Sequence, residues 1–227
     1  MTIRAENIGR VYGDVKGGAV TALADVSMRV AGGECVVILG PSGSGKSTLL
    51  NMLGGLAVPT AGRVLLDDID VYALSKSRRA KLRRETIGFV FQSFHLVPFL
   101  TAEENVRVSL ALRCGSRAAT SAAARGLLDR VGLAARARHL PDQLSVGERQ
   151  RVALARAVAG SPGIILADEP TGNLDPQSAA SVSHYLRQFR DEGTAVIVVT
   201  HDDRLTAIAD RTLALQAGRC SARVGSV

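Results

Sequence analysis

The 227-residue chain has few cysteines and few aromatic residues, and each shortage excludes a class of protein. Its three cysteines, Cys35, Cys114 and Cys220, are odd in number and widely spaced, which argues against a disulfide framework and a zinc site. This cysteine usage is typical of a reducing cytosol. Aromatic residues make up only 4% of the chain, so platforms for stacking nucleic-acid bases are scarce.

Long hydrophobic runs are also missing. No segment approaches the roughly 20 apolar residues that cross a bilayer, and the chain does not open with the basic and apolar segments of a secretory signal. The apolar content of 46% and the charged content of 22% are ordinary for a soluble globular protein. We therefore expect a soluble chain that is long enough to bury a complete core.

Basic residues are in excess, and the net charge is +7. The densest cluster, residues 78–84 (RRAKLRR), contains five cationic side chains. Two interpretations of this cluster stay open. A solvated helix face is favoured, because arginine is spread along most of the chain, and a patch for anionic lipid or nucleic acid is the alternative.

A glycine-rich segment lies between an apolar run and a helical pattern. Residues 40–47 (GPSGSGKS) match the phosphate-loop pattern GxxxxGK[ST], in which backbone N–H groups cradle phosphate oxygens. Residues 35–39 before it are typical of a buried parallel strand, and the helix after it directs its positive N-terminus at an anion. The order of these elements predicts binding of a nucleoside triphosphate. The expected contacts are Gly40, Pro41, Ser42, Gly43, Ser44, Gly45, Lys46, Ser47 and Thr48.

Two carboxylates end a second apolar run. Residues 164–167 (IILA) are followed by Asp168 and Glu169. Downstream of a phosphate loop, Asp168 is expected to hold Mg²⁺ near the triphosphate together with the Ser47 hydroxyl. Glu169 is then expected to orient and polarise the attacking water. For an isolated acidic pair, exposure to solvent at the end of a strand would be the better interpretation.

The order of the apolar runs predicts an α/β fold. Glycine-broken runs in the first 35 residues indicate antiparallel strands. Strands separated by helices then indicate a mostly parallel sheet with crossover connections. The expected later strands are 35–39, 63–66, 87–91, 164–167 and 195–200, and the expected helices are 101–138, 145–158 and 176–190. Thr101 and Glu104 are expected to form a capping box at the start of the first of these helical segments.

Residues 144–151 (LSVGERQR) resemble the LSGGQ-type signature of the ABC (ATP-binding cassette) family. The chain contains four other landmarks of that family, in the family's order along the sequence. They are Tyr12, where such cassettes stack an aromatic ring on adenine, Gln92 at the Q-loop position, Asp175 in the D-loop sequence GNLD, and His201 at the switch position. The resemblance runs from about residue 2 to residue 219. Taken as an ordered set, these motifs are highly specific.

The resemblance implies a single ABC ATPase domain over residues 2–219 and a short tail over 220–227. In this fold a P-loop NTPase core with a mostly parallel sheet carries an N-terminal antiparallel β subdomain. An α-helical subdomain, at about residues 93–160 here, is inserted and contains the signature helix. The implied cofactors are ATP and Mg²⁺.

The resemblance also implies that two cassettes pair head to tail, so that each ATP lies between one phosphate loop and the other copy's signature. Ser145, Gly147 and Glu148 are then expected at the nucleotide of the second copy, with Asp175 crossing the interface. Ser145 and Glu148 also form a capping box, and Asp175 before Pro176 is a helix N-cap. These capping roles and the binding roles are compatible.

The implied chemistry is attack of water on the γ-phosphate, with catalysis mostly by positioning and electrostatics. Lys46 holds the β- and γ-phosphates, Glu169 acts as the base, and His201 steadies the γ-phosphate and the attacking water. Gln92 joins Ser47 and Asp168 in organising Mg²⁺ and water.

The signature departs from the family at one position, because Val146 stands where glycine is usual. Valine would be strained at a positive φ. We therefore expect an ordinary backbone conformation at Val146, with Gly147 making the close backbone approach.

Residues 96–106 and 168–175 resemble the ABC subgroup that serves lipoprotein release and macrolide or peptide efflux. This implies a separate integral membrane permease as partner and a position in the cytoplasm, on the inner face of the cell membrane. The alternative is a cell-division-type cassette that regulates cell-wall hydrolysis through a membrane partner. ABC proteins of DNA repair or translation usually have two cassettes or long insertions, so no nucleic-acid partner is expected.

Overall fold

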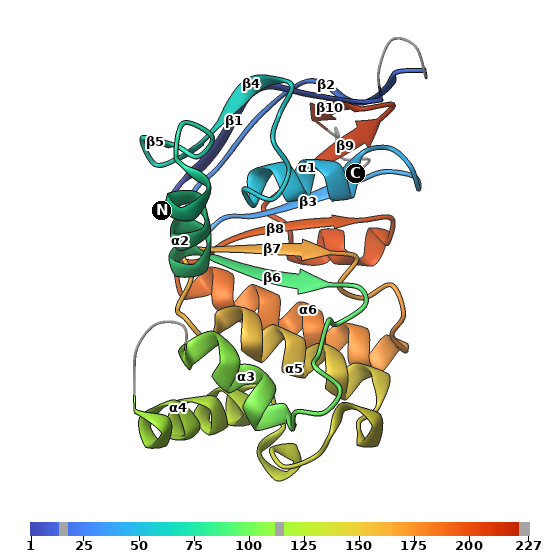
Figure 1. The fold of residues 1–227 in the computed structure, drawn as a ribbon. Coiled ribbons are helices and arrows are strands. Elements are labelled where there is room, and N and C mark those ends of the chain that lie inside the picture. The colour runs from blue at the N-terminus through green and yellow to red at the C-terminus, as the bar shows by residue number, and fades with distance from the viewer. Residues whose placement is uncertain (14–17, 112–115, 223–227) are drawn as a thin grey trace.

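The computed structural model describes residues 1–13, 18–111 and 116–222. They form two β-sheets, with helices between the sheets and on the outer face of the larger one (Figure 1). The smaller, antiparallel sheet has the order β2-β1-β4-β5, with β1 Ile3–Tyr12, β2 Val20–Val30, β4 Ala61–Leu66 and β5 Ile69–Asp70. Its strand pairs β1–β2 and β1–β4 carry register shifts typical of bulges.

The larger sheet has six strands in the order β10-β9-β3-β8-β7-β6. All its pairs are parallel except the β9–β10 hairpin. The strands are β3 Cys35–Leu39, β6 Ile87–Phe91, β7 Ile164–Asp168, β8 Ala195–Thr200, β9 Arg211–Gln216 and β10 Arg219–Ala222. Every residue of β3 and β8 is buried, as expected of central parallel strands covered on both faces.

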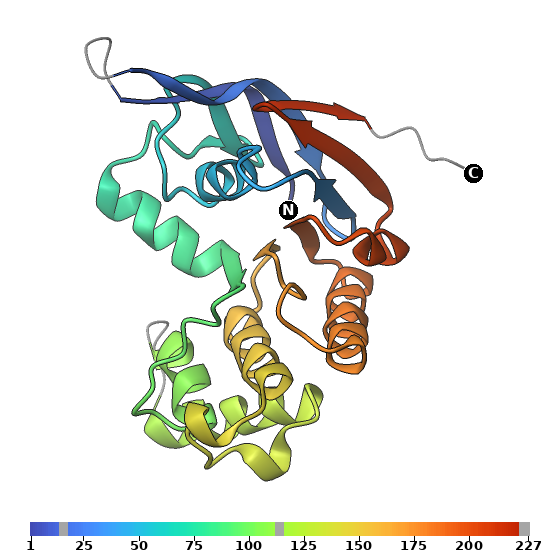
Figure 2. The ribbon, with the colours of Figure 1, turned by 90° about the vertical axis from the view of Figure 1, so that its right-hand side faces the viewer.

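Helices cover both faces of this sheet and also form a separate helical part. They are α1 Lys46–Leu53, α2 Lys76–Thr86, α3 Ala102–Ala111, α4 Arg117–Arg130, α5 Val146–Val158 and α6 Pro176–Asp191, with short 3₁₀ turns η1 Ala134–Arg136, η2 Pro141–Gln143 and η3 Asp203–Ile208. Helix α1 lies between the two sheets and shares one core with them, while α5 and α6 cover the opposite face. A third core joins α3, α4 and α5, and Figure 2 shows this helical part set apart from the sheets.

The expected fold class is confirmed, and the strand and helix bounds agree closely with expectation. The helical pattern over 101–138 is divided, because α4 ends at Arg130 and Gly132 then takes φ +69° in the turn that follows. The expected capping box is present at the start of α3: Thr101 N donates to Glu104 Oε2 (3.0 Å) and Glu104 N donates to Thr101 Oγ1 (3.2 Å).

The sequence analysis missed the hairpin of β9 and β10, and β10 extends to Ala222, beyond the expected boundary at residue 219. Both described cysteines are free thiols, and Cys114 lies outside the described residues. Burial raises the pKa of Cys35 to about 12, which keeps this thiol protonated and unreactive. Within the described ranges, no helix has the length and apolar character needed to cross a bilayer.

Candidate nucleotide site

The phosphate loop connects the end of β3 to the start of α1. Gly45 caps α1 with φ +103°, and an added Cβ there would lie 2.4 Å from the carbonyl oxygen of Ala22. No side chain fits at this position, so the backbone of the loop passes directly against β2. The loop amides at the start of α1 therefore remain available to an anion.

Lys46 is buried at the first position of α1, where only 7% of the residue is exposed. Its Nζ donates to the carbonyl oxygens of Gly40 (2.8 Å) and Pro41 (3.0 Å), within the phosphate loop itself. The same Nζ lies 3.6 Å from Glu169 Oε1. The charge of Lys46 therefore lies between the phosphate loop and Glu169, and a triphosphate would bind between these two elements.

Asp168 ends β7 beside the start of α1. Burial raises the pKa of Asp168, and the nearby charge of Glu169 adds to this rise, while a hydrogen bond from Ser47 and the charge of Lys46 oppose it. A desolvated carboxylate next to a hydroxyl is a site that gains stability from a cation. The structure thus brings Asp168 and Ser47 together, as the sequence predicted.

Glu169 is held by the end of the neighbouring strand, β8. Thr200 Oγ1 donates to Glu169 Oε2 (2.7 Å), His201 N donates to the same oxygen (3.2 Å), and His201 Nδ1 lies 3.0 Å from Glu169 Oε1. Burial raises the pKa of Glu169, but these hydrogen bonds outweigh it, and the net result is a lowered pKa. The carboxylate is therefore kept ionised, as a proton acceptor must be.

The backbone at Glu169 is unusual, because this non-glycine residue has φ 45°. The loop after it is fixed from another element: the buried Gln150 of α5 donates from Nε2 to the carbonyl oxygen of Pro170 (2.9 Å). Gln92 also approaches this loop, since a Cβ on Gly172 would lie 3.1 Å from Gln92 Nε2. A left-handed non-glycine residue that is held from several sides is characteristic of a functional site.

These groups surround one cavity of about 720 Å³. Its walls contain Pro41, Ser42, Gly43, Gly45, Lys46, Ser47, Thr48, Gln92, Asp168, Glu169 and His201, all of them expected from the sequence. Gly40 and Ser44 belong to the same loop but do not line the cavity. Three residues of β2 also line the cavity: Val20, Thr21 and Ala22. They were not predicted, because the pattern of a strand does not show which loop packs across that strand.

Tyr12 lies at the edge of the cavity. It ends β1, is 42% exposed, and pairs in register with Val20, which lines the cavity. The guanidinium of Arg10 lies 4.5 Å from the centre of the Tyr12 ring. The Tyr12 ring therefore lies beside the nucleotide cavity, with the Arg10 guanidinium over one of its faces.

The signature residues do not reach this cavity in the same chain. Ser145 is the N-cap of α5: Glu148 N donates to Ser145 Oγ (3.2 Å), and Ser145 N donates to Glu148 Oε2 (2.8 Å). Val146 begins α5 without a positive φ, as expected, and is 37% exposed. Ser145 and Val146 together are called the signature tip below.

Gly147 and Asp175 also make contacts within one chain. Gly147 lies against Ser178 of α6, where an added Cβ would be 2.2 Å from Ser178 Oγ. The expected approach of Gly147 to a nucleotide stays a prediction. Asp175 caps α6, where its Oδ1 accepts from the backbone N–H groups of Gln177 and Ser178, both at 3.0 Å. The two residues therefore have structural roles within one chain, next to the exposed signature tip.

Comparisons with known proteins agree with this geometry. Residues 23–172 match the family described as ABC transporter. The chain is 50% identical over 218 residues to the lipoprotein-releasing system ATP-binding protein LolD of Bordetella pertussis, covering 96% of this chain and 94% of the relative. It is 45% identical over 219 residues to the LolD of Shewanella frigidimarina, covering 95% and 90%.

A solved structure is similar over the whole chain. It is the dimeric, post-hydrolysis state of the ATP-binding cassette MJ0796 bound to ADP and Pi, with a TM-score of 0.90 and 39% identity over 99% of this chain and all of that one. Fold, site geometry and sequence relatives agree. The chain belongs to the ABC transporter family, as an ATP-hydrolysing subunit.

Proposed function

We propose that this subunit hydrolyses ATP between two copies of itself and so drives a separate membrane permease of the lipoprotein-release type. The chemistry rests on one observation: Glu169 lies between Lys46 (3.6 Å) and His201 (3.0 Å) at the carboxyl end of the parallel sheet. Ligands of open α/β sheets bind at this edge. The near full-length similarity to lipoprotein-releasing relatives supports the permease partner. With such a partner, the subunit would lie on the inner face of the cell membrane.

Binding of the triphosphate begins with an exchange of partners. Lys46 gives up its two carbonyl contacts in the phosphate loop and binds β- and γ-phosphate oxygens instead. Glu169, held by the hydrogen bond from Thr200, accepts a proton from the water that attacks the γ-phosphate. His201, which is 63% exposed at its side chain, is free to follow the γ-phosphate.

The donor set at the end of β7 fits Mg²⁺. Within the described residues, no three His, Cys, Asp or Glu side chains gather as a protein-only metal cage. Asp168 and Ser47 offer one carboxylate and one hydroxyl, which suits an ion that takes its remaining ligands from phosphates and water. When bound, Mg²⁺ would neutralise phosphate charge. Gln92 lines the same cavity and would contact the ion.

A second copy completes the site. The signature tip is exposed and does not line the cavity of its own chain. At this tip, the first turn of α5 presents backbone N–H groups that have no partner within the helix. A head-to-tail partner would bring that positive helix end to the γ-phosphate. The solved cassette that this chain resembles is dimeric, which supports this arrangement.

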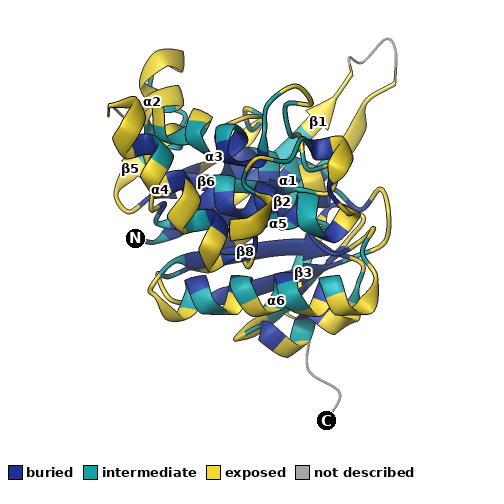
Figure 3. Cartoon of the chain, turned by 90° about the horizontal axis from the view of Figure 1, so that it is seen from below, coloured by how far each residue is buried: buried dark blue, intermediate teal, exposed yellow. Residues whose placement is uncertain are grey.

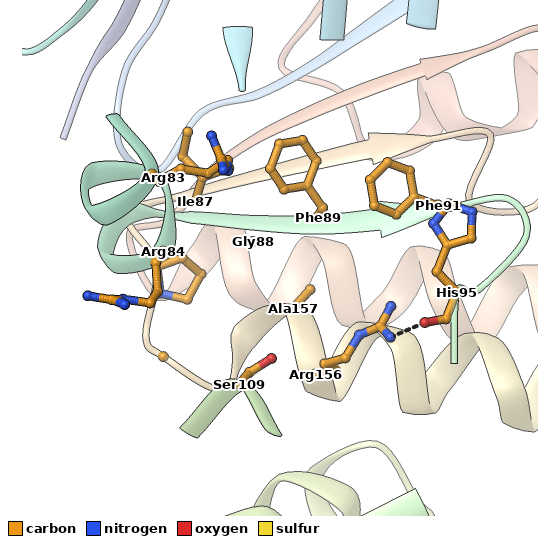
Figure 4. Close-up of a pocket in the computed structure, with 13 residues that line it drawn as sticks. Arg83, Arg84, Ile87, Gly88, Phe89, Phe91, His95, Ser109, Arg156 and Ala157 are labelled. Carbon is orange, nitrogen blue, oxygen red and sulfur yellow. Dashed lines mark hydrogen bonds between the residues drawn. The ribbon is translucent and has the colours of Figure 1, made fainter. Parts of the chain in front are cut away.

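A groove between α2, β6 and α5 is proposed as the permease contact (Figure 4). It encloses about 440 Å³, and the rings of Phe89 and Phe91 stack in its wall with centroids 5.4 Å apart. Arg156 of α5 lies in the same groove and donates to the carbonyl oxygens of Phe94 and His95. A permease segment seated here would press on the loop that begins with Gln92, and so on the nucleotide site.

The variant Glu169→Gln tests the proposal. It should retain ATP binding, lose hydrolysis by at least about 100-fold, and accumulate as an ATP-bound dimer in size-exclusion chromatography. Glu192→Gln, at an exposed carboxylate that pairs with Arg130 (2.7 Å) outside the cavity, is the matched control and should hydrolyse ATP normally. Normal turnover by Glu169→Gln would remove the assigned base.

The same variant tests the partner. Captured with ATP from detergent-solubilised native membranes, it should bring down an integral membrane permease. Recovery of only soluble proteins or nucleic acid would overturn the membrane assignment while leaving the ATPase chemistry intact.

A further inference from the structure

Helix α2 is the most strongly charged element of the chain. Its eleven residues contain six cationic side chains and one acidic residue, Glu85, and none of the eleven is buried. Lys76, Arg78, Lys81 and Arg84 are all exposed and form what is called the basic face below. Figure 3 shows α2 at the edge of the molecule, coloured mostly as exposed.

Leu82 packs α2 against the central core, and two cationic side chains add further contacts. Arg79 lies over the ring of Tyr72, 5.1 Å from its centre, and Arg83 donates to the carbonyl oxygen of Gly55 (3.2 Å). Ser75 caps the first turn by accepting from Arg78 N. Apart from Leu82, the side chains of α2 do not belong to the core, so packing does not explain the charge density of the basic face.

Elsewhere several arginines form ion pairs with carboxylates. Close pairs of 2.7–2.8 Å are Arg63–Glu6, Arg125–Glu103, Arg130–Glu192, Arg190–Asp191 and Arg204–Asp202. On α2 the ion pair between Lys81 and Glu85 is long, at 4.0 Å. Among the residues that the structure describes, Lys76 and Arg78 form no ion pair. The excess of six cationic side chains over one carboxylate in eleven residues distinguishes α2 from the other helices.

We propose that the basic face of α2 binds the headgroups of anionic lipids. Clustered Lys and Arg side chains on an exposed helix are the usual determinants of such binding. Aromatic side chains are absent from α2, which disfavours a nucleic-acid platform. Two exposed apolar residues follow Gly55, the residue that accepts from Arg83: Leu56 (49% exposed) and Val58 (50%). These side chains can enter the lipid–water interface beside the charges of α2.

The position of α2 supports the same occupant. Arg83 and Arg84 line the groove that is proposed as the permease contact, so a permease seated there carries α2 to the level of the membrane surface (Figure 4). This placement rests on the proposed function, whereas the charge argument does not. Lipid binding would orient the subunit at the bilayer and strengthen a permease contact that is otherwise confined to one groove.

Vesicle sedimentation of the purified full-length protein tests the proposal without a permease. We expect binding to phosphatidylcholine vesicles that contain phosphatidylglycerol, weaker binding to phosphatidylcholine alone, and loss of binding as salt is raised. Arg78→Gln/Lys81→Gln should lower the partition coefficient roughly 25-fold, at roughly fivefold for each cation removed. Arg117→Gln/Arg187→Gln removes two exposed arginines from α4 and α6 and should bind almost as the wild type does.

ATP hydrolysis by all the variants reports that the nucleotide site is folded. Equal binding to neutral and anionic vesicles, or equal losses in the two double variants, would overturn the proposal. So would a loss of duplex-DNA binding with unchanged vesicle binding, which would identify α2 as a nucleic-acid patch. A permease that failed to appear in the Glu169→Gln capture would leave the vesicle result untouched, so the two failures are distinguishable.

Discussion

Replacing Gly147 by alanine tests whether α5 and α6 are in close contact behind the signature tip. A Cβ at this position would lie 2.2 Å from Ser178 Oγ and 2.6 Å from Ser178 Cβ. The hydroxyl can rotate away, but Cβ of Ser178 moves only with the backbone of α6. We expect overpacking of about 2–3 kcal/mol, offset by at most about 1 kcal/mol from the higher helix propensity of alanine, because Gly147 lies in the first turn of α5.

The net expectation is a loss of about 1–2 kcal/mol in the free energy of unfolding. Gly126 in α4 is the matched control, because an added Cβ there meets nothing within 4 Å. Gly126→Ala should therefore raise the free energy of unfolding by about 0.5–1 kcal/mol. Urea denaturation followed by circular dichroism measures both variants. If Gly147→Ala stabilised the protein as Gly126→Ala does, the reasoning would be refuted.

A second substitution isolates the contact itself. Ser178→Gly removes both atoms that an alanine at 147 would meet, so Gly147→Ala should cost little in that background. The coupling energy between the two positions is then about 2 kcal/mol. Because α5 carries the signature tip, Gly147→Ala should also lower ATP hydrolysis, and Ser178→Gly should restore part of it.

Two further predictions concern single side chains. Thr200→Val removes the hydroxyl that donates to Glu169 (2.7 Å). It should lower kcat about tenfold, the equivalent of one hydrogen bond, and leave ATP affinity unchanged. A fall in affinity at constant kcat would contradict the positioning role of Thr200. The pKa of Glu103 is lowered from 4.5 by a hydrogen bond from Arg125, a shift that burial opposes, so its stabilisation is present above pH 4.5 and is lost as pH falls through the folded-state value. Glu103→Gln should therefore cost about 1–3 kcal/mol at neutral pH, with a smaller difference from wild type in denaturation curves recorded below pH 4.5.

Local motifs were readable from the sequence because their geometry depends on neighbours in the chain. The phosphate loop between β3 and α1 and the capping boxes at Thr101 and Ser145 all occur where the sequence predicted them. An apolar run that ends in Asp168 also indicated which residues meet at the carboxyl edge of the sheet. Even the valine in the signature was correctly expected to have an ordinary backbone, since a β-branched residue excludes the alternative.

Other features depend on which strands and helices become neighbours. Thr200 and His201 reach Glu169 because β8 pairs with β7 in register, Asp168 opposite Val199, and residues 31 or 32 apart in the chain show no local sign of this contact. The place of β2 in the cavity wall depends in the same way on the packing of the two sheets around α1.

The sequence by itself thus determined the chemistry of this subunit, since the phosphate loop, the paired carboxylates and the signature are each short and contiguous. Only the folded chain shows how Glu169 is restrained, how closely α5 and α6 approach at position 147, and how far the charged side chains of α2 are exposed. The physical reason is that hydrogen bonding, close packing and charge pairing between distant segments arise only once the strand order is established.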